Sequence, residues 1–266
     1  MKLGAILIAF FNSNRKRRNM KRIIVLVAML ASFAFVCPTY SAPEKSTSAK
    51  QVQNTKKAKK VKRVRKPKGD WARFGFYEKA NSEIAKAPKA VFMGDSITFG
   101  WGGKRPEFFT ENNYLCRGIG GQTTAQMLVR FRADVINLKP KYVAIMAGIN
   151  DIAENNGKIK LENVFGNIVS MAQLAKANGI KVILCSTLPA DKIPWNSEIE
   201  NVAEKVKSLN AMLKNFAKKN GFVYVDYYSS LVNENGGLLE KYTSDGVHIK
   251  KEAYILIEPL IKAKIK

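Results

Sequence analysis

The feature that most constrains the fold of this 266-residue chain is a series of short apolar runs separated by segments of helical periodicity. The runs AVFM, YVAIM and VILC are apolar at every position, which is typical of strands buried on both faces of a parallel sheet. With two further runs, the sequence predicts five strands, at residues 90–93, 114–116, 142–146, 181–185 and 222–226.

The segments around these strands predict helices at residues 75–87, 124–138, 161–177, 198–218 and 250–264. The dipeptides Asn178-Gly179 and Asn220-Gly221 are typical stops for two of them. This alternation predicts a three-layer α/β/α sandwich around a five-stranded parallel sheet. Ligands of such folds bind beyond the carboxyl ends of the strands, so we expect the functional residues in the loops that follow them.

The N-terminal quarter of the chain has a different composition. Residues 1–69 hold 18 of the 45 Lys and Arg residues and a single acid, Glu44, so +17 of the formal net charge of +24 lies there. A charge of this size would by itself suggest a nucleic-acid partner, but its concentration outside the periodic part argues against one. We therefore expect a leader at 1–41, a basic disordered linker at 42–69 and one domain at 70–266.

The expected leader has the pattern of a secretory signal peptide. In residues 20–41 two basic residues precede an apolar stretch, and cleavage is predicted between Ser41 and Ala42. Met20 begins this better-formed leader, and we hypothesise that translation starts there. The pattern predicts export to the periplasm or the extracellular space, with a lipid anchor at Cys37 and an uncleaved membrane anchor as alternatives.

The expected linker contains almost no large apolar side chains, so it cannot offset the entropy cost of ordering. It is interpreted either as a solvated spacer or as a tether that makes weak contact with an anionic surface. The two cysteines of the domain, Cys116 and Cys185, would suit a disulfide in an exported protein. Their strands are not expected to be neighbours, so we predict buried free thiols instead.

Four clusters of polar and glycine residues lie at the ends of strands or in a late loop. The first is GDSITFG at 94–100, where Ser96 can present a nucleophilic hydroxyl, although Gly-Asp-Ser alone fits an ordinary helix cap better. The second is RGIGGQTT at 117–124, which offers backbone N–H donors but lacks the spacing of a phosphate-binding loop. The third is AGIND at 147–151, where Asn150 can donate to an oxyanion or simply form a turn.

The fourth cluster, SDGVHIK at 244–250, contains His248, the only histidine of the chain. If the chemistry requires an imidazole base, no other residue can supply it. Asp245 lies three residues earlier and can accept a hydrogen bond from the ring. Such a bond would fix the tautomer of the imidazole and stabilise its protonated form.

In this order, the four clusters resemble the SGNH (GDSL-type) hydrolase superfamily over roughly residues 90–260. In detail the chain is similar to bacterial acylhydrolases of the platelet-activating-factor acetylhydrolase-like and carbohydrate acetylesterase groups. The resemblance implies the flavodoxin-like fold of that superfamily and a carboxylic ester hydrolase. The family often has Asp where this chain has Gln122. The residues that match its catalytic set are Ser96 as nucleophile and oxyanion N–H, Gly121 and Asn150 in the oxyanion hole, and Asp245 and His248 as acid and base.

Substrate expectations rest on this resemblance and on the predicted export. We expect a small-molecule or glycan ester, with acetyl esters of carbohydrate favoured. Phe99, Trp101 and Trp195 fit sugar stacking, and ordinary packing is the alternative for each tryptophan. A lysophospholipase, a thioesterase or a non-catalytic binder of anionic polymers are the alternative functions. Because the sequence has no Cys/His cluster with ligand spacing, we expect neither a metal nor a cofactor.

Overall fold

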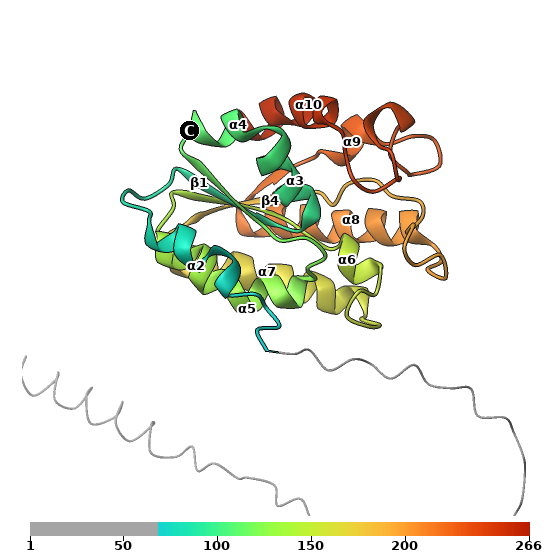
Figure 1. The fold of residues 1–266 in the computed structure, drawn as a ribbon. Helices are drawn as coiled ribbons and strands as arrows, with labels where there is room; N and C mark the ends of the chain where they lie inside the picture. The colour runs from blue at the N-terminus through green and yellow to red at the C-terminus, as the bar shows by residue number, and fades with distance from the viewer. Residues whose placement is uncertain (1–68) are drawn as a thin grey trace, which may run out of the picture. The chain divides into compact units, whose positions relative to one another are not determined.

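The computed structural model describes residues 69–266, and within them five strands form one parallel sheet in the order β2-β1-β3-β4-β5 (Figure 1). The predicted leader at 1–41 and nearly all of the predicted linker at 42–69 lie outside the described residues. The predicted sandwich with a five-stranded parallel sheet is confirmed. The strands are β1 Ala90–Gly94, β2 Tyr114–Gly118, β3 Tyr142–Met146, β4 Lys181–Cys185 and β5 Val223–Val225.

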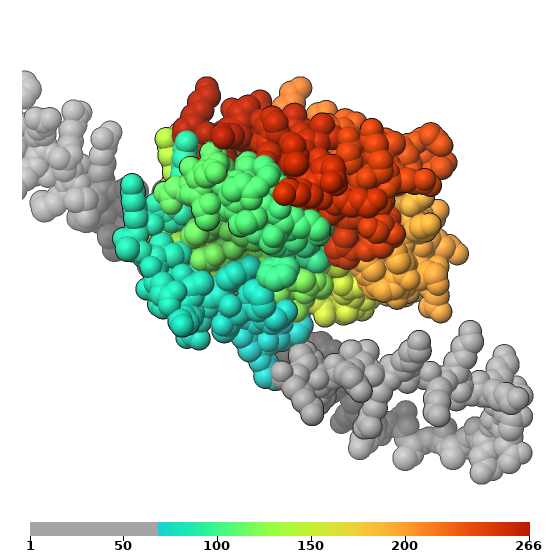
Figure 2. Space-filling view, turned by 45° about the horizontal axis from the view of Figure 1, so that its top comes forward, coloured from blue at the N-terminus to red at the C-terminus, as the bar shows by residue number. Residues whose placement is uncertain are grey.

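Alternate residues of each strand enter two separate cores, which is why the runs AVFM, YVAIM and VILC are apolar at every position. Val91 and Met93 belong to the core that includes side chains of α5 and α7, whereas Phe92 belongs to the core that includes α3, α4 and α10. Figures 1 and 2 show α10 beside α3 and α4. The helices are α2 Gly75–Ser82, α3 Ser96–Lys104, α4 Pro106–Thr110, α5 Thr124–Asp134, α6 Ile149–Ile152, α7 Leu161–Ala177, α8 Val202–Asn220, α9 Tyr228–Leu231 and α10 Lys251–Lys262.

Several predicted helix boundaries are wrong, while α7 agrees with its prediction. The helix expected at 124–138 breaks at Val135, whose φ of −131° is not helical, and continues as a 3₁₀ turn over Ile136–Leu138. The helix expected at 198–218 begins only at Val202, after a left-handed Asn201, and α10 is shorter than 250–264. The helix expected at 75–87 ends at Ser82, and the proline at position 88 accounts only for the non-helical geometry of residue 87.

Helix α3 carries the first motif, and the periodicity did not predict it as a helix. Its sequence SITFGWGGK has three glycines, each of which lowers intrinsic helix stability by about 1 kcal/mol. Tertiary packing compensates, because α3 lies directly on β2. A Cβ at Gly118 would lie 2.2 Å from the backbone nitrogen of Phe99, so only glycine permits this close approach. Helix α3 begins two residues after the end of β1, with Ser96 as its first residue.

The prediction that Trp101 contacts substrate is wrong. Its side chain is 1% exposed and stacks on Phe108 with ring centroids 5.1 Å apart. Its indole N–H donates to Glu258 Oε1 at 3.2 Å, which satisfies the polar end of the ring inside the core. The residue lies on the side of α3 that faces α10 and therefore belongs to the core between these helices.

The prediction of free thiols is confirmed, although only Cys185 is fully buried and Cys116 is partly exposed. Two strands separate β2 from β4, so the two sulfurs belong to strands that are not neighbours. Within residues 69–266, every helix is too short or too polar to span a bilayer.

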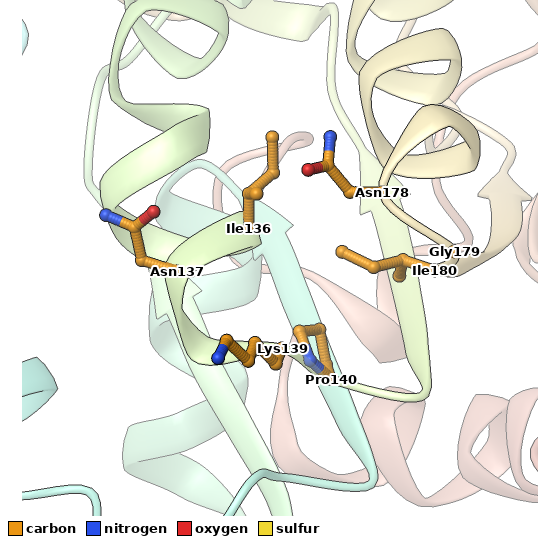
Figure 3. Close-up of a pocket in the computed structure, with 7 residues that line it drawn as sticks. All are labelled: Ile136, Asn137, Lys139, Pro140, Asn178, Gly179 and Ile180. Atoms are coloured by element: carbon orange, nitrogen blue, oxygen red, sulfur yellow. The ribbon is translucent and has the colours of Figure 1, made fainter.

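A hollow of about 600 Å³ lies at the amino ends of β3 and β4 (Figure 3). It is lined by the loop that precedes β3 and the loop that precedes β4. Because the strands are parallel, this hollow lies at the sheet edge opposite the four motif clusters. Its lining residues are Ile136, Asn137, Lys139, Pro140, Asn178, Gly179 and Ile180.

Candidate functional site

Ser96 stands at the junction between β1 and α3. The strand ends at Gly94, Asp95 caps the helix by accepting a hydrogen bond from the Ile97 amide at 2.9 Å, and Ser96 is the first helical residue. This position leaves the Ser96 amide among the unpaired donors of the first helical turn. The Ser96 hydroxyl lies 2.9 Å from Nε2 of His248, a residue 152 positions later in the chain.

His248 is held by a tight loop in which one carboxylate organises both ring and backbone. Asp245 Oδ2 lies 2.6 Å from His248 Nδ1, while its Oδ1 accepts the amides of Val247 at 2.9 Å and His248 at 2.7 Å. The hydroxyl of Thr243 donates to the His248 carbonyl at 2.8 Å and closes the loop. The spacing Asp-x-x-His therefore produces a locally fixed imidazole.

The charge of Asp245 follows from these contacts. Partial burial raises the pKa of its carboxyl, but the hydrogen bonds from the His248 ring and from the two backbone amides together outweigh it. The pKa of Asp245 is therefore below its usual value. Near neutral pH the group is an anion beside the imidazole, which can stabilise a positive charge on His248.

Gly121 and Asn150 lie in the segments that directly follow β2 and β3. The loop after β2 borders Ser96, since a Cβ at Gly120 would lie 3.9 Å from the Ser96 Cβ. Asn150 is 2% exposed, on the short helix α6, whose capping residue Gly148 has a φ of 120° that favours glycine. The Asn150 side chain donates to the Gln122 carbonyl at 3.0 Å, which ties the two loops together.

The structure places two of the three predicted aromatic residues on the surface. Trp195, on the loop after β4, is 46% exposed, and its ring centroid lies 6.1 Å from that of His248. Phe99 is 49% exposed, one helical turn after Ser96, and packs edge-on against Phe76 at 6.0 Å. Both residues thus present apolar surface, Trp195 next to the imidazole and Phe99 on the helix that carries the serine.

Polar residues outside the four clusters support these loops. Arg130 is fully buried and donates from Nε to Gln122 Oε1 at 2.6 Å, while it also pairs with Asp134 at 2.8 Å. Asn155 bonds to Asn150 and to Trp195 at 2.8 Å each. The pair of Arg130 and Asp134 could have been predicted from the sequence, because the two residues are four positions apart on one helix. The other partners are brought together only by the fold.

Two buried carboxyls near the site have perturbed acidity. Burial raises the pKa of Asp95 to about 6, although the hydrogen bond from the Ile97 amide and the nearby His248 oppose the shift. Burial likewise raises the pKa of Asp151 to about 6, against hydrogen bonds from the amide and hydroxyl of Thr124. Asp95 is the N-cap of α3, whereas Asp151 accepts the amide of Thr124, the first residue of α5, whose N-cap is Thr123.

The predicted catalytic and oxyanion residues all lie within the segment that matches a known protein family. The sequence model of the GDSL-like lipase/acylhydrolase family matches residues 92–255. A candidate acylhydrolase from Bacteroides fragilis is 52% identical, with a TM-score of 0.73, and the alignment covers 74% of this chain and 98% of that one. A GDSL-like lipase from Bacteroides thetaiotaomicron is 49% identical, with a TM-score of 0.71 and coverage of 73% and 97%.

A shorter similarity links the chain to a curated protein. An uncharacterized lipoprotein of Bacillus subtilis is 40% identical over 78 residues, which cover 28% of this chain. The match spans 32% of the lipoprotein, or about a third of its length.

Proposed function

Because the chain belongs to the GDSL-like lipase/acylhydrolase family, and thus to the carboxylic ester hydrolases, we propose that it is a serine esterase whose triad is Ser96, His248 and Asp245. One observation carries the proposal. Three side chains from two distant segments form a continuous chain, with 2.9 Å between Ser96 Oγ and His248 Nε2 and 2.6 Å between His248 Nδ1 and Asp245 Oδ2. This order of nucleophile, base and orienting acid is the one that acyl transfer requires.

In the proposed cycle, His248 removes the proton of Ser96 while the serine oxygen attacks the ester carbonyl. His248 then gives this proton to the leaving alcohol, which departs as the acyl-enzyme forms. A water molecule, deprotonated by His248, attacks the acyl-enzyme. The bond between the acyl carbon and Ser96 Oγ then breaks, His248 returns the proton to the serine oxygen, and the acid is released. Throughout the cycle, the anionic Asp245 holds the ring and stabilises its protonated form.

The oxyanion of each tetrahedral intermediate needs donors that are already in place. We assign this role to the backbone N–H groups of Ser96 and Gly121 and to the side chain of Asn150. The Ser96 amide is a free donor of the first turn of α3, and the loop of Gly121 borders Ser96. One N–H of the Asn150 amide is used by Gln122, which leaves the other for the oxyanion.

For the substrate, we propose acetyl esters of carbohydrate. The exposed ring of Trp195 beside His248 supports this proposal, because an aromatic face can stack on a sugar ring. A hollow of about 530 Å³ borders the Asp245 loop and is lined by polar residues that include Asp191, Asn233 and Glu240. These polar side chains can form hydrogen bonds with the hydroxyl groups of a sugar, which is the alcohol part of the proposed ester.

We also propose that the protein is exported. Similarity to a lipoprotein supports this assignment, as does the leader-like sequence at 1–41. The division into a leader, a basic linker at 42–69 and a hydrolase domain at 70–266 is part of the same proposal. Mass spectrometry of the mature N-terminus tests it, because cleavage before Ala42 and a lipid on Cys37 give different masses.

The test of the activity is a series of p-nitrophenyl acetate, butyrate and octanoate, assayed beside acetylated xylan, pectin and acetylated sialic acid. We expect the wild-type protein to prefer the acetyl ester and to release acetate from at least one glycan, and Ser96→Ala to release none. A preference for octanoate would assign the exposed Phe99 and Phe76 rings to an acyl chain and favour a lysophospholipase or thioesterase. No hydrolysis of any ester would favour a binding protein.

A further inference from the structure

Asn155 lies between Trp195 and Asn150, and nothing in the catalytic motifs assigns it a role. We infer that Asn155 is a positioning residue that orients the oxyanion-binding amide of Asn150 and couples this amide to the aromatic ring of Trp195. The inference rests on the proposed function, because it concerns the same reaction and the same site. Asn155 does not touch the reacting atoms in this scheme and acts through Asn150.

The contacts form a chain of three hydrogen bonds. The indole N–H of Trp195 donates to Asn155 Oδ1 at 2.8 Å, and Asn155 Nδ2 donates to Asn150 Oδ1 at 2.8 Å. Asn150 Nδ2 in turn donates to the Gln122 carbonyl at 3.0 Å. The chain thus runs from the exposed substrate side of the site to the loop after β2.

The direction of this chain is fixed by chemistry at both ends. An indole nitrogen can only donate and a carbonyl oxygen can only accept, so neither amide between them can flip without losing a bond. The Asn150 amide is therefore held with its oxygen toward Asn155 and its nitrogen toward Gln122. Its second N–H has a fixed direction before any substrate arrives, which is the preorganisation that an oxyanion donor needs.

Asn155 also contacts the other loop of the oxyanion hole. Its Nδ2 lies 3.3 Å from the carbonyl oxygen of Gly121 and donates to it. One exposed amide thus bonds to both Gly121 and Asn150, the two residues that we place in the oxyanion hole beside Ser96. A substrate that packs on Trp195 would restrict the motion of this ring and, through Asn155, of the Asn150 amide. Substrate binding at Trp195 is thereby linked to the position of the oxyanion donor.

The neighbouring residue provides a matched control. Asn156 lies on the same loop and donates to Thr123 Oγ1 and Gln126 Oε1, at 2.9 Å and 2.8 Å, but has no bond to Asn150. Loss of either asparagine removes hydrogen bonds of this loop. Only loss of Asn155 removes a bond to the oxyanion donor.

The test compares kcat and KM for p-nitrophenyl acetate in the full chain, per active site counted with a serine-directed phosphonate. We expect Asn155→Ala to lower kcat roughly ten-fold with KM within about two-fold, as befits weakened support for one oxyanion donor. Asn155→Asp should lower kcat at least as much, because its carboxylate still accepts from Trp195 but cannot donate to Asn150. Asn156→Ala should stay within about two-fold of wild type.

A double-mutant cycle tests the coupling. Trp195→Phe keeps an aromatic side chain and removes the indole N–H, and we expect roughly a two- to three-fold lower kcat. In the Asn155→Ala background the same change should have no further effect, since its partner is already gone. A wild-type kcat in Asn155→Ala, or effects of the two substitutions on kcat that simply multiply in the double variant, would overturn this inference but not the proposed function. A wild-type protein that hydrolyses no ester would overturn the proposed function and this inference with it.

Discussion

The two edges of the parallel sheet carry hollows of similar size and different chemical character. The hollow at the amino edge measures about 600 Å³, and the side chains of Figure 3 provide it with one charged group, Lys139. The hollow at the carboxyl edge measures about 530 Å³ and is lined by Asp191, Lys192, Glu240 and Asp245. Only the second borders a chain of hydrogen-bonded groups that includes a histidine.

The volume of a hollow therefore does not identify the functional site in this molecule, whereas the side chains beside it do. At the carboxyl edge, segments that follow β1, β2 and β3 and the late His248 loop converge on one place, because parallel strands end together there. The strand order reverses between β1 and β3, so the loop that carries Ser96 lies between the loops after β2 and β3. Among the described residues, the lining of the amino-edge hollow shows no such convergence of functional groups.

The largest effect is expected from His248→Ala, which should lower kcat by roughly 10⁴-fold or more because it removes the base that lies 2.9 Å from the Ser96 hydroxyl. Circular dichroism should show an unchanged fold, since the imidazole is partly exposed. As His248 is the only histidine of the chain, diethyl pyrocarbonate should inactivate the wild type with a stoichiometry of one imidazole. Wild-type kcat in the variant would refute the assignment of the base.

Asn150→Ala should lower kcat by roughly 10²–10³-fold with little change in KM, because an oxyanion donor acts mainly in the transition state. Asn210 is the matched control, since its buried amide accepts from the Thr187 amide at 2.8 Å and donates to the Thr187 carbonyl at 2.9 Å. Asn210→Ala should lower the free energy of unfolding, measured in urea, while kcat per folded molecule is kept. Equal losses of kcat in the two variants would show that Asn150 has no special role.

The sequence was sufficient to predict the fold because the determining signals are local. Apolar runs identified the strands, and helical periodicity between them identified α7 with its bounds and α5, α8 and α10 apart from their ends. Helix α3 was missed for a physical reason. Its glycines weaken the local signal, and the contact with Gly118 that requires a close approach comes from another strand.

The candidate site was predictable to the extent that its residues sit in recognisable clusters. Trp101 and Trp195 show the limit of this prediction: both were expected to contact a sugar, but one is 1% and the other 46% exposed. No property of the two local sequences separates them, because burial of Trp101 depends on α10, which begins about 150 residues later. Asn155 was missed for the same reason, since its role depends on Trp195, 40 positions away.

Asp95→Asn should change how stability depends on pH. The folded pKa of Asp95 is about 6, above the ordinary value of about 4, so burial of its charge destabilises the fold increasingly as pH rises through this window. The variant keeps the helix cap and removes the charge. Its free energy of unfolding relative to wild type should therefore increase by on the order of 1–3 kcal/mol between about pH 4 and pH 7.

Urea unfolding of both proteins at several pH values measures this effect. Asp245→Asn is the control of opposite sign, because the pKa of Asp245 is lowered, so its contribution to stability is lost as pH falls through its folded pKa. If the free energy of unfolding depends on pH in the same way in wild type and Asp95→Asn, the Asp95 carboxyl has the same pKa in the folded protein and in the unfolded chain.

The smallest effect is expected at the amino edge, where Asn137→Ala enlarges the hollow of Figure 3. Asn137 is exposed and lies at the sheet edge opposite Ser96, so kcat should stay within about two-fold and the free energy of unfolding within about 0.5 kcal/mol. Hydrolysis of p-nitrophenyl acetate measures kcat, and urea unfolding measures the free energy of unfolding. A ten-fold loss of kcat at unchanged stability would mean that the amino-edge hollow takes part in function, and the contrast between the two edges would then be wrong.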